Sequence, residues 1–290
     1  MATKIKEIKL NDIHKSKWPL VIGYFGSIHV MHCQLFEKFH HFNVLTFKDF
    51  NPKTKTQLYT FNERIKNIAK FGPQNIFIYD LSKDNMKAEE FVQRVLLPIK
   101  PNSIVVGTNF KFGSDHKPYS ILNKYFKVDS VNYNARVSTT LISQMLSNKQ
   151  VEKANNFLYQ PYHYTSQWIK GQKRGTTLGF RTINLKVDRS LAVCEGSYVA
   201  RIKLGRKWLK AVAFVGASKT FKMNVPTIEV HAFNKRLLPR SLYPQSIRNK
   251  MQVEFLKYIR ENTKYKSSKL LVKAIERDIK TAKAYFERNK

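Results

Sequence analysis

The sequence predicts two domains of different class: an α/β domain with a parallel sheet, followed by an antiparallel β domain that ends in a helix. In the first half, short apolar runs alternate with segments of helical periodicity, which is typical of strand–helix–strand units. After residue 160, short β-like runs follow one another and are separated by glycine and proline signals. We therefore expect two domains, 1–159 and 160–290.

The first domain is expected to alternate strands and helices along its whole length. Its strand candidates are short apolar runs, whereas its helix candidates place apolar residues three and four positions apart. Gly72 follows one such segment and is a typical helix stop. The expected elements are strands at 18–25, 42–47 and 75–81, helices at 61–72 and 87–100, a strand with a glycine-bearing loop at 102–113, and a helical region at 138–158.

The second domain is expected to be an antiparallel barrel or sandwich with a C-terminal helix. The helix has one apolar face, and Ser267 or Ser268 could cap its start. The expected strands are 162–171, 197–204, 207–216, 227–234 and 250–260. The helical face comprises Leu271, Ala274, Ile275, Ile279, Ala282 and Phe286.

Composition and charge limit the classes of protein that fit. Cys33 and Cys194 are far apart, which argues against a disulfide framework or a cysteine-based zinc site and favours the cytoplasm. The charged N-terminus has no signal core, and no apolar run reaches the roughly 18 residues of a membrane span. The net charge is +32, but the basic residues form no discrete arm, so nucleic-acid binding is the less favoured class.

The stretch GYFGSIHVMH places His29 and His32 directly after an apolar run. This spacing puts both rings on one side of a helix that begins there, where free N–H groups and the helix dipole favour an anion. Histidines at this point can donate hydrogen bonds to a phosphate. A metal half-site would need further ligands, and no nearby set supplies them. From the residues alone, a phosphate-binding pair and a structural pair both remain open.

Two later segments of the first domain also suit a nucleotide. VVGTNFKFG places Asn109 at the carboxyl end of a strand, where open α/β sheets bind ligands. RVSTT, residues 136–140, begins with an arginine and continues with three hydroxyl residues, a combination that suits a phosphate clamp. Hydroxyl residues before a helix are just as often plain caps.

In the second domain, the segment KGQKRGTTLGFRTINL (170–185) carries the strongest chemical signal. Its glycines lie among basic residues, as a loop whose backbone approaches phosphates requires. Thr182 and Asn184 are two residues apart, so on a strand their side chains share a face. Their oxygens suit Mg²⁺, which takes a few protein ligands together with phosphates and water. The alternative is a surface loop before an ordinary strand.

The first-half segments together resemble the adenylyltransferase half of the bacterial bifunctional riboflavin kinase/FAD synthetase family. That family shows GxFDGxHxGH, VVGxNFxFG and RxSSTxIR in this order. The resemblance implies a nucleotidyltransferase-like (Rossmann-like) domain that adenylates FMN, in which His29 and His32 contact ATP phosphates and Asn109 lines the nucleotide and flavin site. The other residues implied to bind ATP are Gly23, Phe25, Arg136, Thr139 and Thr140.

The chain departs from this family pattern at several positions. Met31 stands at the glycine of HxGH, Gly26 and Ser27 replace Asp-Gly, and Ser143 stands at the second arginine of RxSSTxIR. The DPHP-like stretch after the second strand is absent, since the chain reads KDFNP there. A flexible methionine at position 31 would have to swing aside to admit a nucleotide. An inactive adenylyltransferase domain is therefore the alternative.

The second-half segment resembles the riboflavin kinase signature GxxRGxxLGFPTANL. EGSYVARI, AFVGASKTF, TIEVHAFN and the C-terminal tail follow that module in order, which implies a small antiparallel β-barrel packed by a terminal helix. Arg181 replaces the signature proline, and Ser218-Lys219 replaces Asn-Pro. The residues that the resemblance implies at the ATP phosphates are Gly171, Arg174, Gly175, Gly179, Thr182 and Asn184.

The resemblance also implies a metal site and a general base in the second domain. Thr182 and Asn184 would bind Mg²⁺, and Glu229 would activate the ribityl 5′-hydroxyl of riboflavin. From the residues alone, Glu229 equally fits an outward-facing strand position between Ile228 and Val230.

The combined prediction is a flavin-cofactor enzyme that phosphorylates riboflavin to FMN and adenylates FMN to FAD. Its expected ligands are riboflavin, FMN and ATP with Mg²⁺, without a membrane partner. One alternative is a riboflavin kinase whose adenylyltransferase domain is inactive. The less favoured alternative is a basic nucleic-acid-binding protein, which would bind with a steep salt dependence.

Overall fold

The computed structural model contains two compact units, Met1–Thr139 and Thr140–Lys290. The structure describes residues 3–8, 14–48, 57–132, 137–169, 179–187, 191–217, 226–233 and 250–289.

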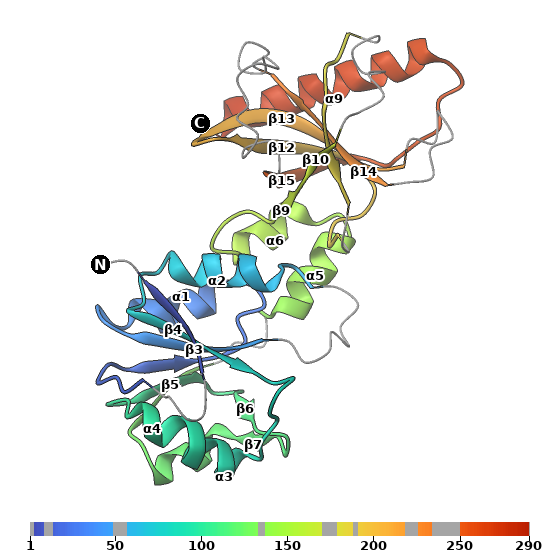
Figure 1. Cartoon of the computed structure of the whole chain (residues 1–290). Helices are drawn as coiled ribbons and strands as arrows, with labels where there is room; N and C mark the ends of the chain where they lie inside the picture. Colours follow the sequence, from blue (N-terminus) through green and yellow to red (C-terminus); the bar gives the residue numbers. More distant parts are fainter. Residues whose placement is uncertain are drawn as a thin grey trace. The chain divides into compact units, whose positions relative to one another are not determined.

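The first unit is built on a parallel sheet (Figure 1). Among its described residues, six strands lie in the order β1 (Lys4–Glu7), β4 (Asn75–Asp80), β3 (Asn43–Lys48), β2 (Leu20–Ile22), β5 (Ile104–Gly107) and β8 (Val128–Val131). Every neighbouring pair is parallel. β2 has β3 on one side and β5 on the other, so the strand order reverses there. In open α/β sheets this reversal point is where ligands bind.

Helices cover both faces of this sheet (Figure 1). One face carries α1 (Val30–Glu37) and α2 (Phe61–Ala69), and the other carries a continuous helix made of α3 (Ala88–Phe91), η1 (Val92–Leu96) and α4 (Leu97–Ile99). Side chains of β2 alternate between the two cores: Val21 packs on the first face, and Leu20 and Ile22 on the second. This alternation follows from the two-residue period of a strand, and burial on both faces explains its continuous apolar run.

The predicted α/β class of the first unit is confirmed, and the differences lie at element ends. The expected strand 18–25 stops at Ile22, because Gly23 begins the turn into α1. The helix expected at 87–100 is present, with a π-helical turn at η1 that periodicity did not indicate. β1 was not expected, because its sequence KIKE is largely exposed and charged, as is common for an edge strand.

The second unit contains an antiparallel sheet that curls into a nearly closed barrel. Its described strands lie in the order β10 (Trp168–Ile169), β11 (Ile183–Lys186), β14 (Thr227–Ala232), β13 (Lys207–Gly216), β12 (Gly196–Leu204), β15 (Met251–Arg260) and β9 (His163–Ser166). The outermost strands of this order, β9 and β10, are separated only by Gln167 in the chain. The backbone N–H of Lys186 on β11 donates to the Gln167 carbonyl at 2.9 Å, which continues the β10–β11 pairing to the residue that follows β9. The predicted barrel is confirmed.

A long C-terminal helix, α9 (Ser268–Arg288), packs on the outside of this barrel. Ser267 caps it by accepting from the backbone N–H of Leu270, as expected. The predicted apolar face is present, but Asp278 also lies on it and is 3% exposed. Asp278 accepts from the Ser197 hydroxyl at 2.9 Å and from two guanidinium nitrogens of Arg260, so this carboxylate joins α9 to β12 and β15.

The helices α5 (Thr139–Ser147) and α6 (Val151–Phe157) precede the barrel, and α6 is attached to it. The Asn155 side chain donates to the Phe255 carbonyl at 2.8 Å and accepts from the Tyr162 N–H at 2.9 Å. The division between the two units falls after Thr139, the first residue of α5, ahead of the expected domain boundary at 159/160. That boundary stays a prediction.

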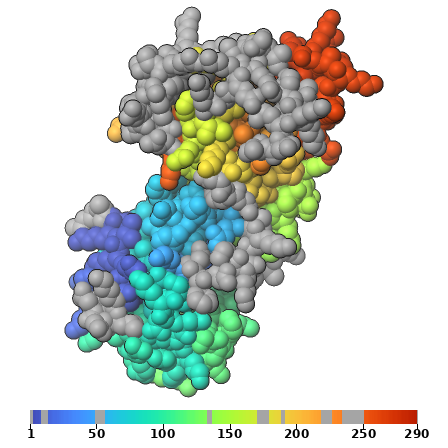
Figure 2. All heavy atoms as spheres, turned by 45° about the vertical axis from the view of Figure 1, so that its right-hand side comes forward, coloured from blue at the N-terminus to red at the C-terminus, as the bar shows by residue number. Residues whose placement is uncertain are grey.

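The space-filling view shows the N-terminal segment in dark blue and the light-blue segment that includes α2 sharing the surface of the first unit (Figure 2). Within the described part of the chain, none of the helices combines the length and apolar character that crossing a membrane requires.

Candidate functional site

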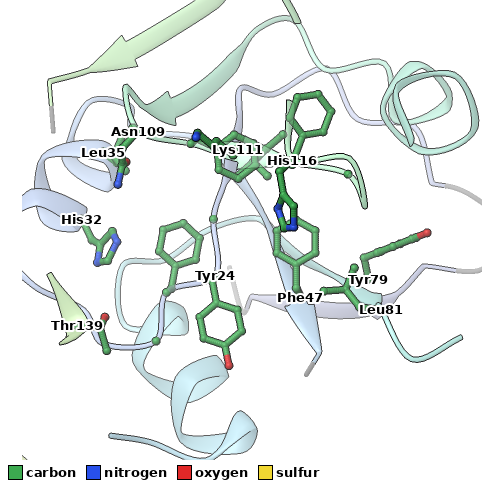
Figure 3. Close-up of a pocket in the computed structure, with 18 of the residues that line it drawn as sticks. Tyr24, His32, Leu35, Phe47, Tyr79, Leu81, Asn109, Lys111, His116 and Thr139 are labelled. Carbon is green, nitrogen blue, oxygen red and sulfur yellow. The ribbon is translucent and has the colours of Figure 1, made fainter. Parts of the chain in front are cut away.

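A cavity of about 660 Å³ opens at the carboxyl ends of the parallel strands in the first unit (Figure 3). Ile22 and Gly107 end β2 and β5 and both line it, as does Val131 at the end of β8. The cavity thus lies at the point where the strand order reverses, the place where α/β sheets bind ligands.

The turn from β2 into α1 forms one wall of the cavity. Phe25 has a left-handed backbone (φ 53°), which is uncommon for a residue with a side chain. Its buried ring folds back under Gly23, where a Cβ atom would come within 2.7 Å of the ring. The same ring meets His32 edge-on with 5.1 Å between centroids. Glycine at position 23 is therefore needed for the close approach that this turn makes.

His29 and His32 lie together on this wall, as their spacing predicted. Their rings stack with 3.8 Å between centroids, and His29 is the N-cap residue of α1. The buried Nδ1 atoms of both rings have no hydrogen-bond partner among the described residues. Burial lowers the pKa of His29 to about 4. Burial, and secondarily the neighbouring His29, lower the pKa of His32 to about 3. Both imidazoles are therefore neutral at pH 7 and can each donate one N–H.

A buried arginine fixes the backbone of Tyr24 beside the histidines. Arg64 on α2 is 2% exposed, and its guanidinium donates to the Tyr24 carbonyl at 2.5 Å and to the Phe47 carbonyl at 3.0 Å. Its Cζ lies 4.0 Å from the centre of the Tyr24 ring. Thr46 also donates to the Tyr24 carbonyl, at 3.1 Å. The cavity wall is thus tied to α2 and β3.

The start of α5 completes the polar end of the cavity. Thr139 lines the cavity, and its hydroxyl is 3.0 Å from the hydroxyl of Ser27. Asn109, two residues after the end of β5, also lines the cavity. A Cβ on Gly107 would come within 3.0 Å of the Asn109 side-chain oxygen, so the glycine admits this amide.

The opposite end of the cavity is aromatic. In the close-up, His32 and Thr139 lie at one end, and Phe47, Tyr79 and His116 lie at the other (Figure 3). His116 belongs to the tip of a hairpin formed by β6 (Lys111–Phe112) and β7 (Lys117–Pro118). The hairpin tip is docked on α3, since Asp115 accepts from the Ala88 N–H at 2.9 Å.

The cavity therefore gathers residues that the sequence places far apart. Six predicted site residues line it: Gly23, Phe25, His29, His32, Asn109 and Thr139. Met31 lines it as well, while Thr140 does not. Arg136 lies outside the described residues. Sequence reasoning missed Tyr24, Ser27 and Arg64. Tyr24 stands inside the quoted motif, but a buried arginine on a helix leaves no signal in the sequence.

The second unit brings together three of the predicted kinase residues. Asn184 on β11 is the direct antiparallel partner of Glu229 on β14, so their side chains share one face of the sheet. Thr182 precedes Asn184 by two residues, just before β11 begins. All three are partly exposed, whereas Ile228 and Val230 beside Glu229 are fully buried. A hydroxyl, an amide and a carboxylate thus lie along one face of the barrel.

The loop that leads to this face is only partly described. Gly179 has φ 85°, a left-handed conformation that favours glycine, and Arg181 accepts a hydrogen bond through its carbonyl from the His231 ring at 2.9 Å. Gly171, Arg174 and Gly175 lie outside the described residues, as does the Ser218-Lys219 replacement. The described part of the chain contains no group of three or more His, Cys, Asp or Glu side chains that could hold a metal ion.

The fold and its sites define a class of protein with a nucleotidyltransferase-like α/β unit and a flavokinase-type barrel. A family model described as FAD synthetase matches residues 12–144, and one described as riboflavin kinase matches residues 158–286. The chain belongs to the bifunctional riboflavin kinase/FAD synthetase family, whose members are enzymes of flavin biosynthesis.

Relatives of the chain carry matching names. The trifunctional protein RibF/MnmA of Mycoplasmoides gallisepticum is 34% identical over 93% of this chain, and the chain spans 40% of that protein's length. The bifunctional riboflavin kinase/FMN adenylyltransferase of Mycoplasma pneumoniae is 26% identical, with 92% of this chain and 97% of the relative covered. The Bacillus subtilis enzyme of the same name is 25% identical, with 94% and 93% covered.

A solved structure shares the whole architecture. A crystal structure described as a macrolide-efflux protein from Streptococcus pneumoniae superposes with a TM-score of 0.80 and 26% identity, covering 98% of this chain and 99% of that one. That description differs from the names of the sequence relatives. The two family models and the sequence relatives agree with one another, so they decide the family.

Proposed function

We propose that the chain catalyses two successive reactions, phosphorylation of riboflavin to FMN in the barrel and adenylation of FMN to FAD in the α/β unit. The observation that carries the proposal is the cavity at the strand-order reversal. It gathers a stacked histidine pair, a clamp hydroxyl and an amide at one end and aromatic side chains at the other. A cavity with one polar end and one aromatic end suits a pair of substrates that carry phosphate groups as well as a flat aromatic ring.

In the α/β unit, a phosphate oxygen of FMN attacks the α-phosphorus of ATP, and pyrophosphate leaves. His29 and His32 donate N–H hydrogen bonds to phosphate oxygens whose charge grows in the transition state. Thr139 holds a further phosphate oxygen through its hydroxyl. Approach of the polyphosphate favours the charged imidazolium form, which burial disfavours in the free protein.

The aromatic end of the cavity receives the flavin ring in this proposal. Phe47 and His116 present ring faces and edges there, and stacking on such groups stabilises a flat aromatic ligand (Figure 3). Met31 lies among the lining residues, where its flexible side chain can move to admit the nucleotide.

In the barrel, the ribityl 5′-hydroxyl of riboflavin attacks the γ-phosphorus of ATP. Glu229 accepts the hydroxyl proton as the bond to phosphorus forms, and ADP leaves. The residues present fit Mg²⁺, since Thr182 and Asn184 offer two oxygen ligands on the face that carries Glu229. Mg²⁺ bound there would neutralise charge on the phosphates.

Incubation of the purified chain with riboflavin and MgATP, followed by chromatography of the flavins, tests both reactions. The expected products are FMN and then FAD. If FMN accumulates without FAD, the chain is a kinase only; if no FMN forms, the kinase proposal fails. Supplying FMN directly isolates the second reaction from the first.

We further assign the adenylyltransferase to residues 1–159 and the kinase to 160–290, and we place both in the cytoplasm. The two free cysteines, Cys33 and Cys194, accord with a reducing compartment.

A further inference from the structure

Ser27 is a residue of the β2–α1 turn whose contacts reach two groups of the cavity. It is 1% exposed and does not line the cavity itself. Its hydroxyl lies 3.0 Å from the hydroxyl of Thr139, a residue 112 positions later in the chain that does line the cavity. The chain departs from the family motif at both positions, with serine for glycine at 27 and threonine for serine at 139.

The same residue contacts the histidine pair through its backbone. The Ser27 backbone accepts a hydrogen bond from the His32 ring, which raises the pKa of that ring and so opposes the lowering by burial. The neighbouring Gly26 also lies next to Thr139, since a Cβ there would be 3.4 Å from the Thr139 methyl carbon, an ordinary contact distance. Ser27 is thus held between a ring and a hydroxyl that both serve the phosphate end.

We propose that Ser27 is a positioning residue for adenylyl transfer, which orients the Thr139 hydroxyl toward the triphosphate and keeps it in register with His32. The inference rests on the proposed adenylyl transfer in this cavity. It also assigns a role to the departure from the family motif at position 27, because the Ser27 hydroxyl contacts the Thr139 hydroxyl directly and can fix its orientation.

The hydrogen-bonding capacity of two hydroxyls explains how the positioning works. Each hydroxyl has one proton and two lone pairs, so the Ser27–Thr139 bond can run in either direction in the free protein. When a phosphate oxygen accepts the Thr139 proton, only the Ser27 proton remains to make the bond. Ser27 then donates to Thr139, and Thr139 donates to phosphate. A chain of this kind polarises each member and strengthens the contact with the anion.

The test is a double-mutant cycle on the full chain, with pyrophosphate release from FMN and MgATP as the readout. Ser27→Ala is expected to raise the KM for ATP roughly tenfold with a smaller change in kcat. The effect of Ser27→Ala should persist in a Thr139→Ser background, which keeps the hydroxyl, and vanish in a Thr139→Val background. If the fold-changes in the KM for ATP caused by Ser27→Ala and by Thr139→Val multiply in the double variant, the two residues act independently and the inference is wrong.

Controls separate positioning from folding and from the proposed function. Ser120→Ala removes an exposed hydroxyl and should match the native chain. A bond that only fastened the turn to α5 would lower the unfolding temperature and leave the KM unchanged, which would overturn the inference. If Ser27→Ala does not fold, Thr139→Val deletes the same bond and must raise the KM.

If the native chain releases no pyrophosphate, the proposed function fails, and the inference is decided by binding. Calorimetry with inorganic tripolyphosphate then compares the native chain with Ser27→Ala. Weaker binding by the variant supports positioning of an anion site, and equal binding overturns it.

Discussion

Asn184 and Glu229 face each other across the antiparallel strands β11 and β14, so an amide and a carboxylate lie side by side on one face of the barrel. This pairing joins two segments of the chain that are 45 positions apart (229 minus 184). It places a candidate base directly beside a candidate metal ligand, as γ-phosphoryl transfer requires.

Replacement of Glu229 tests the base. Glu229→Gln keeps the shape and the strand but cannot accept a proton, so we expect kcat for FMN formation to fall roughly 10²- to 10⁴-fold with little change in the KM for ATP. Single-turnover assays of FMN measure this. Lys203→Ala, an exposed change on the same barrel, is the control. Near-native turnover by Glu229→Gln would remove Glu229 from the mechanism.

Replacement of Thr182 tests the metal site. Thr182→Ala removes one oxygen ligand, so the Mg²⁺ concentration for half-maximal FMN formation should rise roughly 10- to 100-fold while the fold is unchanged. The measurement is a Mg²⁺ titration at saturating ATP, with circular dichroism to check folding. An unshifted titration curve would show that Thr182 does not contact the metal.

The histidine pair of the cavity predicts a pH dependence of stability. The pKa of each ring in the unfolded chain is near 6.5, and burial lowers it to about 4 for His29 and about 3 for His32. Below pH 6.5 the unfolded chain therefore binds protons that the folded chain does not, so stability falls from pH 6.5 down to about pH 4 and then pH 3.

Thermal unfolding across this pH range measures the effect. The double variant His29→Gln/His32→Gln should flatten the loss between pH 6.5 and 4, and His40→Gln, at an exposed position, should not. An equally steep loss in the double variant would assign it to other groups.

We expect the size of the Met31 side chain, which lines the cavity, to affect how the nucleotide enters. Met31→Gly widens the cavity beside the histidines, so the KM for ATP in FAD formation should fall. Glycine in the first turn of α1 costs about 1 kcal/mol of stability, which a denaturation curve will register separately. Met31→Ala removes most of the side chain without the glycine cost and should shift KM in the same direction. A higher KM in both variants would mean that Met31 contacts the nucleotide productively.

The pair of Arg260 and Asp278 fastens α9 to the barrel. Asp278→Ala leaves the guanidinium and Ser197 without their carboxylate, so we expect a loss of about 3 kcal/mol in the free energy of unfolding. Arg260→Met/Asp278→Leu removes both charges and should recover part of this loss. Urea denaturation followed by tryptophan fluorescence compares the variants. A loss below 0.5 kcal/mol, roughly the effect of a typical surface change, would mean that the pair adds little.

Local patterns predicted most of the fold because they act over one turn or one strand. The alternation of Leu20, Val21 and Ile22 between two cores follows from a buried parallel strand. Ser267 was found as a cap because its position before the apolar face is a local signal. Asp278 was missed because a carboxylate on an apolar stripe can only be understood once Arg260 is seen opposite it.

The candidate sites were predictable where they lie in contiguous motifs. His29, Asn109 and Thr182 belong to such motifs, whereas the Ser27–Thr139 contact joins residues 112 positions apart and has no local signature. Arg64 was equally hidden, since its two carbonyl partners come from different strand ends.

The ring of Phe25 beneath Gly23 makes these two positions dependent on each other in evolution. A side chain at position 23 would strike the Phe25 ring at 2.7 Å, and that ring is itself packed against His32 and Phe36. Alanine at 23 is therefore harmful while phenylalanine remains at 25, and becomes tolerable only after position 25 has lost its ring. The order of substitutions therefore matters in this turn. As long as position 25 is phenylalanine, position 23 has to remain glycine.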